Sequence, residues 1–184
     1  MQKIILSAVL GGLTLFVWGV FSWMVLPFHK ATMKDMPNEQ AIVEALRANL
    51  TEPGVYSYPG MAIYETDEAA WTAQHKQGPI VSMLVYNPDG MEPMEPMVFI
   101  KGLCIDMLAA GLSALMLAMV VSAVPSYGRR ILMGTMLGVF AALVSHFMLW
   151  NYAMIPAGYT LAMSLDLVVG WTLAGAVIGK IIKP

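Results

Sequence analysis

Charged residues are scarce in this chain, and the few that it has are unevenly placed. Of the 184 residues, 12% are charged and 58% are hydrophobic, whereas a soluble domain carries about 25% charged residues. Long stretches hold no charge at all, while the segment from about residue 29 to residue 97 has the composition of soluble protein. The scarcity argues against a wholly soluble protein and predicts a membrane bundle with one small additional domain.

Cysteine is nearly absent as well. The single Cys104 cannot form a disulfide within the chain, so the soluble-like segment has to fold without one. About 70 residues suffice for a small domain, although its stability is marginal when no disulfide supports it. We expect Cys104, close to the start of the second apolar run, to act as a small packing residue.

The usual catalytic motifs are missing too. The soluble-like segment has no serine in a Gly-x-Ser-x-Gly setting, no Cys–His pair and no glycine-rich loop for phosphate. His29 and His75 are isolated in sequence, as solvated or capping histidines usually are. These absences argue against an enzyme, and we assign no catalytic residue.

Four apolar runs are present, over residues 4–28, 99–124, 131–155 and 158–181. Each supplies the roughly 20 apolar residues that a membrane-spanning helix needs. The first run is too long for a signal-peptide core and no small-residue cleavage site follows it, so we expect a retained anchor. The predicted fold is an all-α bundle of four transmembrane helices, with a small α+β extracytoplasmic domain inserted between the first and second.

This fold divides the chain into a first helix over 1–28, a domain over 29–98 and three helices over 99–184. Ten of the twelve acidic residues lie in the domain, between the first two spans. The two termini and the turn before the third span hold no acidic residue. Their charged residues are all basic, namely Lys3, Arg129, Arg130, Lys180 and Lys183. The positive-inside rule therefore predicts cytoplasmic termini and a periplasmic domain, as in a multi-pass protein of a bacterial inner membrane.

The inserted domain carries readable helix and strand signals. Asp35 or Asn38 is a candidate cap for its first helix, and Thr66 or Asp67 for its second. An Asn-Pro-Asp-Gly turn over 87–90 follows the best strand of the chain. The pattern predicts a helix over 41–50, strands over 55–58 and 61–64, a helix over 67–77 and a strand over 80–86.

A methionine-rich segment, Met-Glu-Pro-Met-Glu-Pro-Met, ends this domain. Two prolines three residues apart favour polyproline II, in which Met91, Met94 and Met97 would share one edge. Three interpretations stay open. The thioethers could bind Cu(I), completed by Met33, Met36 or His29; they could form a packing ridge; or they could form an adaptable edge for docking a partner protein.

Asp106, His146 and Asp166 form the other candidate site, because each lies within an apolar run. A buried ionisable group in lipid is costly, so such groups face the bundle interior or a partner. Each lies on a stripe of small residues spaced four apart, which allows close helix packing. We expect the three to meet in the outer half of the bundle, as ties between helices, as a proton or ion site, or as a metal site with mixed His and Asp ligands.

The leading hypothesis is a non-catalytic membrane protein that serves as an accessory or partner-binding subunit of a larger membrane complex. Its partners would be lipid and either other membrane proteins or further copies of the chain, and nothing indicates nucleic acid. The first alternative is a small ion- or proton-handling transport protein that uses the Asp/His cluster. The second is periplasmic copper handling through the methionine segment.

Overall fold

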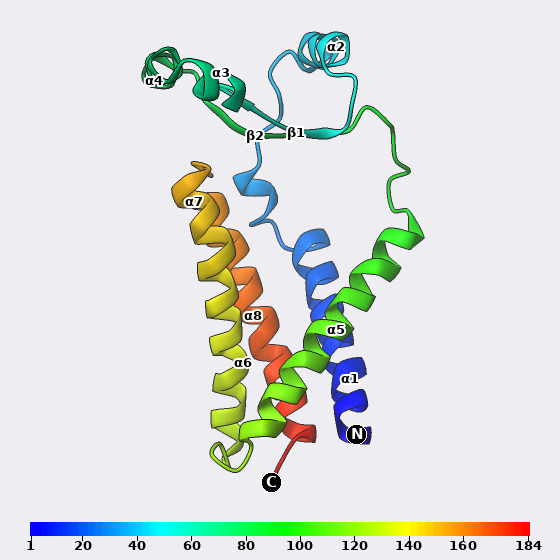
Figure 1. The fold of residues 1–184 in the computed structure, drawn as a ribbon. Helices are drawn as coiled ribbons and strands as arrows, with labels where there is room; N and C mark the ends of the chain where they lie inside the picture. The colour runs from blue at the N-terminus through cyan, green and yellow to red at the C-terminus, as the bar shows by residue number, and fades with distance from the viewer. The chain divides into compact units, whose positions relative to one another are not determined.

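Four helices of the computed structural model, which describes residues 1–184, are long and apolar enough to cross a membrane. The third of them is interrupted by a short π-helical segment, η2 (Leu143–Phe147). The prediction of four such helices is confirmed, with ends that shift by a few residues (Figure 1). Their bounds are α1 (Gln2–Met24), α5 (Pro96–Val120), α6 (Tyr127–Ala142) continued by α7 (Met148–Tyr152), and α8 (Ala157–Ile181).

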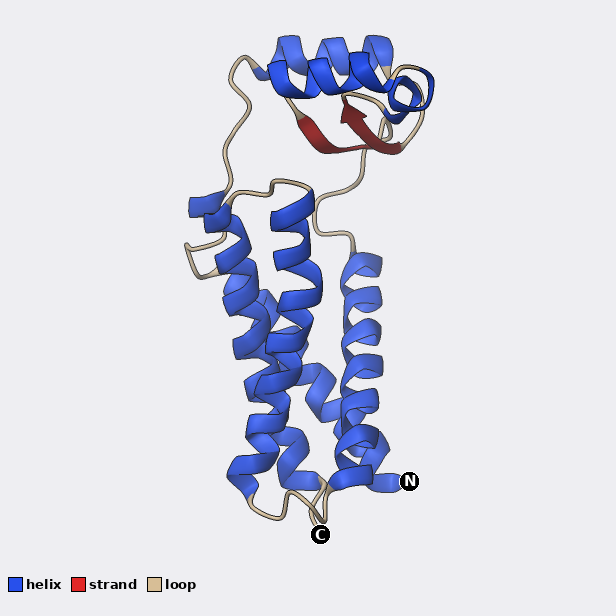
Figure 2. Cartoon of the chain, turned by 60° about the vertical axis from the view of Figure 1, so that its left-hand side comes forward, coloured by secondary structure: helices blue, strands red, loops and turns tan.

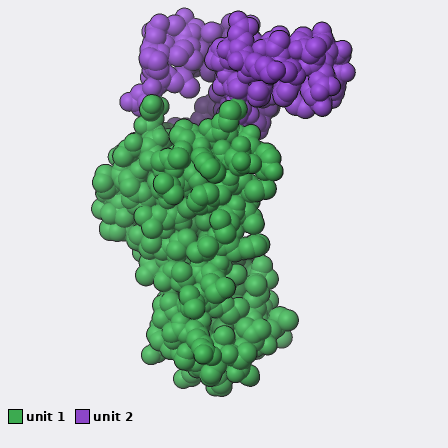
Figure 3. Space-filling model, turned by 90° about the vertical axis from the view of Figure 1, so that its left-hand side faces the viewer, with its two compact units in different colours: residues 1–34, 93–184 green, residues 35–92 purple.

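Two compact units make up the chain (Figure 3). The helical unit contains residues 1–34 and 93–184, and the inserted unit contains residues 35–92. Figure 2 shows that both strands belong to the inserted unit, whereas the helical unit is built from helices and connecting loops.

The inserted unit is built on a two-stranded antiparallel sheet of β1 (Gly54–Tyr58) and β2 (Val81–Tyr86). Gly54 pairs with Tyr86 and Val55 with Val85, and the register is irregular between Tyr56 and Tyr58. Three helices accompany the sheet: α2 (Glu39–Asn49), α3 (Met61–Thr66) and α4 (Glu68–Gln77). The prediction of a mixed helix-and-strand unit is confirmed.

The strand predicted over 61–64 is wrong, because these residues form helix α3. Tyr64 packs edge-on against Trp71 of α4, with ring centroids 5.2 Å apart. The cap at Asp67 is confirmed, since its Oδ1 accepts a hydrogen bond from the Ala70 amide at 2.9 Å. Asn38 occupies the N-cap position of α2, but its side chain makes no capping hydrogen bond.

Within the helical unit, α8 packs against α6 on one side and α1 on another, while α5 packs along α1. Gly134 and Gly138 are buried, and they let α6 lie directly against α8, as expected for a stripe of small residues. The Thr135 and Thr172 hydroxyls also hydrogen-bond across this interface at 2.9 Å. The buried apolar core consists mainly of Ala110, Ala114, Leu117, Ala174, Ile178 and Ile182.

The closest approaches between helices occur at glycines. A Cβ placed on Gly134 would lie 2.6 Å from Gly175 Cα, and one placed on Gly12 would lie 2.5 Å from Met107 Cα. Both distances are shorter than real Cβ contacts, so no other residue fits without moving a helix. The predicted small-residue spacing thus corresponds to close packing, and Gly12 adds a contact between α1 and α5.

We predict that Gly134→Ala destabilises the helical unit. The added methyl would also lie 2.7 Å from the Trp171 carbonyl oxygen, so α6 and α8 would have to separate. Overpacking of this kind costs about 1–3 kcal/mol. The free energy of unfolding in detergent measures it. The control is Gly128→Ala in the same helix, where the methyl meets nothing within 4 Å; equal losses in both variants would contradict the prediction.

Candidate functional site

A buried histidine lies in the turn that follows α1, immediately before the short 3₁₀ helix η1 (Lys30–Thr32). His29 is only 2% exposed. Its ring stacks on Trp23 at a centroid distance of 4.1 Å and contacts Phe28 at 4.2 Å. Two aromatic rings therefore hold the imidazole in place, and the expectation of a solvated His29 is wrong. His29 does occupy the N-cap position of η1, although its side chain makes no capping hydrogen bond.

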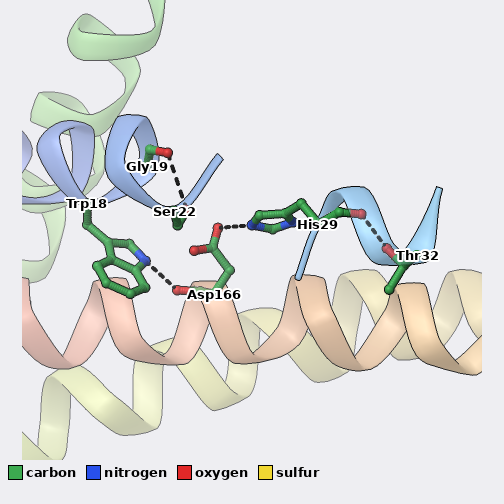
Figure 4. Close-up of polar contacts among 6 residues, drawn as sticks. All are labelled: Trp18, Gly19, Ser22, His29, Thr32 and Asp166. Atoms are coloured by element: carbon green, nitrogen blue, oxygen red, sulfur yellow. Dashed lines mark hydrogen bonds and ion pairs between the residues drawn. The ribbon is translucent and has the colours of Figure 1, made fainter. Parts of the chain in front are cut away.

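Asp166 of α8 faces this histidine (Figure 4). His29 Nε2 lies 3.7 Å from Asp166 Oδ2, and the aspartate side chain is 14% exposed. The backbone carbonyl of Asp166 accepts a hydrogen bond from Trp18 Nε1 at 3.0 Å. The side chain and the backbone of this one residue thus contact two different parts of the segment from α1 to η1.

Further contacts fix the segment around His29. The Thr32 hydroxyl donates to the His29 carbonyl at 2.8 Å, and η1 itself packs against α8. Ser22, which is fully buried, donates to the Gly19 carbonyl at 3.2 Å (Figure 4). The turn that leaves α1 is therefore anchored on α8 rather than free.

The His29–Asp166 pair has unused hydrogen-bonding capacity. At 3.7 Å the two side chains are an electrostatic contact but are too far apart for a hydrogen bond. Neither His29 Nε2 nor Asp166 Oδ1 has a hydrogen-bond partner, although both atoms are buried. Buried polar atoms usually find a partner. The contact therefore leaves one nitrogen of the imidazole and one oxygen of the carboxyl group without a hydrogen-bond partner.

His146 lies in the π segment of the third span and is partly buried. It is close enough to Asp166 for an electrostatic interaction, but no hydrogen bond or ion pair joins the two residues. A π segment inserts extra backbone into a helix, so His146 leaves the straight continuation of the Gly134–Ala142 stripe. The structure gives Asp166 a nearer partner in His29.

Asp106 lies apart from that pair, in an open groove of about 270 Å³ between α1 and α5. The rest of the lining is apolar or glycine. No hydrogen bond or ion pair joins Asp106 to His146 or Asp166. The lining residues on α1 are Phe16, Gly19, Val20, Trp23 and Met24, and those from the start of α5 are Val98, Phe99 and Gly102.

The methionine segment does not form the polyproline II edge that its prolines favour. Met94 has φ +67°, which is left-handed backbone. Pro96 is the first residue of α5, a position at which proline suits a helix, so Met97 lies in the first helical turn. Met91, Met94 and Met97 are all largely exposed.

The side chains that usually bind metals are dispersed. No group of three or more His, Cys, Asp and Glu residues is positioned to hold a metal ion. Cys104 is a free, exposed thiol. The one ion pair of the chain is the aromatic-lined contact between His29 and Asp166, and Asp166 is one of the residues that the sequence singles out.

No protein-family model, curated protein or solved structure matches the chain. Its function is therefore proposed from its own residues and their contacts.

We predict measurable energetic coupling between His29 and Asp166. In a double-mutant cycle with His29→Gln and Asp166→Asn, contacting residues of this kind couple by about 1 kcal/mol. The readout is the free energy of unfolding in detergent. The control cycle replaces His29→Gln with Lys30→Gln, since Lys30 is exposed and makes no ion pair with Asp166. A coupling of zero between His29 and Asp166 would show that the contact has no energetic role.

Proposed function

We propose that this protein is a non-catalytic subunit of a larger membrane complex and that it binds partner proteins through residues 35–92. The observation that supports this role is that almost none of the side chains of the inserted unit are fully buried. Pro59 is its only buried residue, and its helices α2, α3 and α4 bury none. A domain with so small a core gains stability when a partner covers its apolar surface.

One face of the sheet supplies such a surface, which we call the valine face: Val55, Met83 and Val85. In β2 these side chains alternate with partly buried ones, as the pleat of a strand requires. Val55 and Val85 are paired across the two strands and are 66% and 74% exposed. A contiguous exposed apolar patch of this type marks an interaction site in many soluble domains.

The sheet is also incomplete at its edges. It has only two strands, so each strand leaves one row of backbone donors and acceptors unpaired. A two-stranded sheet is marginally stable by itself. A partner strand added at an edge would supply backbone hydrogen bonds and would extend the valine face at the same time.

The opposite side of the sheet forms an apolar groove of about 480 Å³ against α2. Ile42, Leu46 and Leu50 line it from α2 and the residue that follows, and Tyr56 and Leu84 line it from the strands. All five are partly buried. The unit's own helix α2 partly covers this side, which makes the more exposed valine face the better candidate for a partner.

The proposed setting is a bacterial inner membrane crossed by the four long helices. Both termini would lie in the cytoplasm, and the acidic inserted unit would lie in the periplasm. Support comes from the distribution of charge, since the ends of the chain and the α5–α6 turn hold basic residues and no acids.

Native membranes solubilised in mild detergent provide the test. We expect the protein to migrate in native electrophoresis as part of a larger assembly, with an additional protein identified in the same band. Val55→Asp and Val85→Asp should each shift it to lower mass, because a carboxylate on the valine face cannot be desolvated without a partner charge.

The matched control is Ala73→Asp on α4, an exposed position of the same unit that receives the same charge. The control should leave the assembly unchanged. A single, monomeric species of the wild-type protein in native membranes would refute the proposed function.

The buried His29–Asp166 contact favours a second candidate function, proton handling by the helical unit. The imidazole is shielded by Trp23 and Phe28, and both polar groups have free hydrogen-bonding capacity. Ionisable groups inside membrane bundles are often parts of proton relays. In this role Asp166 would exchange a proton with His29, and His146 would influence it electrostatically.

Proteoliposomes that contain a trapped pH-sensitive dye test this second candidate. We expect an imposed pH gradient to decay faster with the wild-type protein than with Asp166→Asn or His29→Gln. Asp106→Asn, which removes a carboxyl group outside the pair, should behave like the wild-type protein. Decay at the rate of protein-free vesicles would exclude the proton-handling role and would leave the partner-binding role untouched.

A further inference from the structure

A buried arginine joins three elements at the end of the helical unit that contains the α5–α6 turn. Arg130 is 8% exposed. Its Nε donates to the Gly179 carbonyl of α8 at 2.8 Å, and its Nη1 donates to the Pro125 carbonyl at 2.5 Å and the Val124 carbonyl at 3.5 Å. The guanidinium therefore uses backbone carbonyls as acceptors, as cations near helix C-termini do.

These carbonyls offset only part of its charge. No carboxylate lies within 4.0 Å of any lysine or arginine in the chain, since the single ion pair is that of His29 and Asp166. Nη2 of Arg130 makes no hydrogen bond, and it is not among the buried atoms that lack a partner. This nitrogen therefore reaches the protein surface with both of its hydrogens free. A buried charge normally has a counter-charge, and this one has none within the chain.

A second cation shares the aromatic neighbour of this arginine. The Arg130 guanidinium carbon lies 6.0 Å from the centroid of the Tyr127 ring, and Lys180 Nζ lies 5.6 Å from the same centroid. The Tyr127 hydroxyl donates to the Ala176 carbonyl at 3.0 Å, which fixes the ring against α8. Arg129 precedes Arg130 in the sequence, and Arg129 and Lys180 are both exposed and form no ion pair.

We propose that Arg130, Arg129 and Lys180 bind the phosphate of an anionic phospholipid headgroup. A guanidinium with a free N–H₂ edge fits phosphate oxygens, and an ammonium adds a mobile donor. The site lies at the end of membrane-crossing helices, where headgroups are found. Leu132 and Met136 on α6 are exposed by 55% and 61% and offer an apolar surface for acyl chains. The inference depends on the membrane-crossing helices and not on the proposed partner binding.

The test uses the full-length protein in neutral detergent, titrated with dioleoyl phosphatidylglycerol, dioleoyl phosphatidylcholine or inorganic phosphate. The readout is the rise in the thermal unfolding midpoint, from which an apparent affinity is obtained. We expect the anionic lipid to raise the midpoint, the zwitterionic lipid to raise it far less and inorganic phosphate to leave it unchanged. Arg129→Gln and Lys180→Gln should each weaken the affinity for phosphatidylglycerol about fivefold.

Lys101→Gln is the matched control. Lys101 is an exposed cation near the start of α5, whereas the Arg130 site lies beside the turn that follows the C-terminal end of α5. The control should keep the wild-type affinity. Equal affinities for the two lipids, or an equal loss in all three variants, would overturn the proposal. A shift of the midpoint with inorganic phosphate alone would replace the lipid with a small soluble anion. Arg130→Gln removes structural hydrogen bonds, so Arg129 and Lys180 decide the result.

Discussion

The close approach of α8 to its neighbours is the constraint on which the helical unit depends. Apolar side chains gain little from contact with one another in lipid, so helices associate through close packing and a few polar bonds. Gly134 and Gly175 allow α6 to touch α8, and Gly170 allows the Trp18 side chain of α1 to lie against it. Because α8 packs against both neighbours, it holds Asp166 beside His29 and Gly179 beside Arg130.

The helical unit could be predicted from the sequence in outline, because its signals are local. Runs of about 20 apolar residues predict helices that are long and apolar enough to cross a membrane, and small residues four apart predict faces that pack closely. The contact between His29 and Asp166 could not be predicted, because it joins residues that are far apart in the sequence. The neighbours of His29 in sequence are polar or aromatic, and only the turn after α1 places it on α8. The helix over 61–66 was missed because Tyr64 and Trp71 pack together, a contact that strand propensity does not register.

The two units differ in how much of their surface they cover themselves. The helical unit exposes apolar side chains that suit lipid, and it buries a core of small and aliphatic side chains. The inserted unit has the polar and acidic composition of a soluble domain, but its apolar side chains are only partly covered. A partner on the valine face would cover exposed apolar side chains of the inserted unit. A lipid phosphate at Arg130 would supply a counter-charge in the helical unit.

The π segment Leu143–Phe147 determines the direction in which the side chains of α7, the rest of the third long helix, point. Each residue turns an α-helix by about 100°, so a π segment rotates the next turn relative to the stripe before it. Loss of one residue within this segment would let α6 run on unbroken into α7 and would turn Trp150 to a different side. A length change of one residue here would thus alter which side chains are exposed on the helix, with almost no change in overall composition or hydropathy.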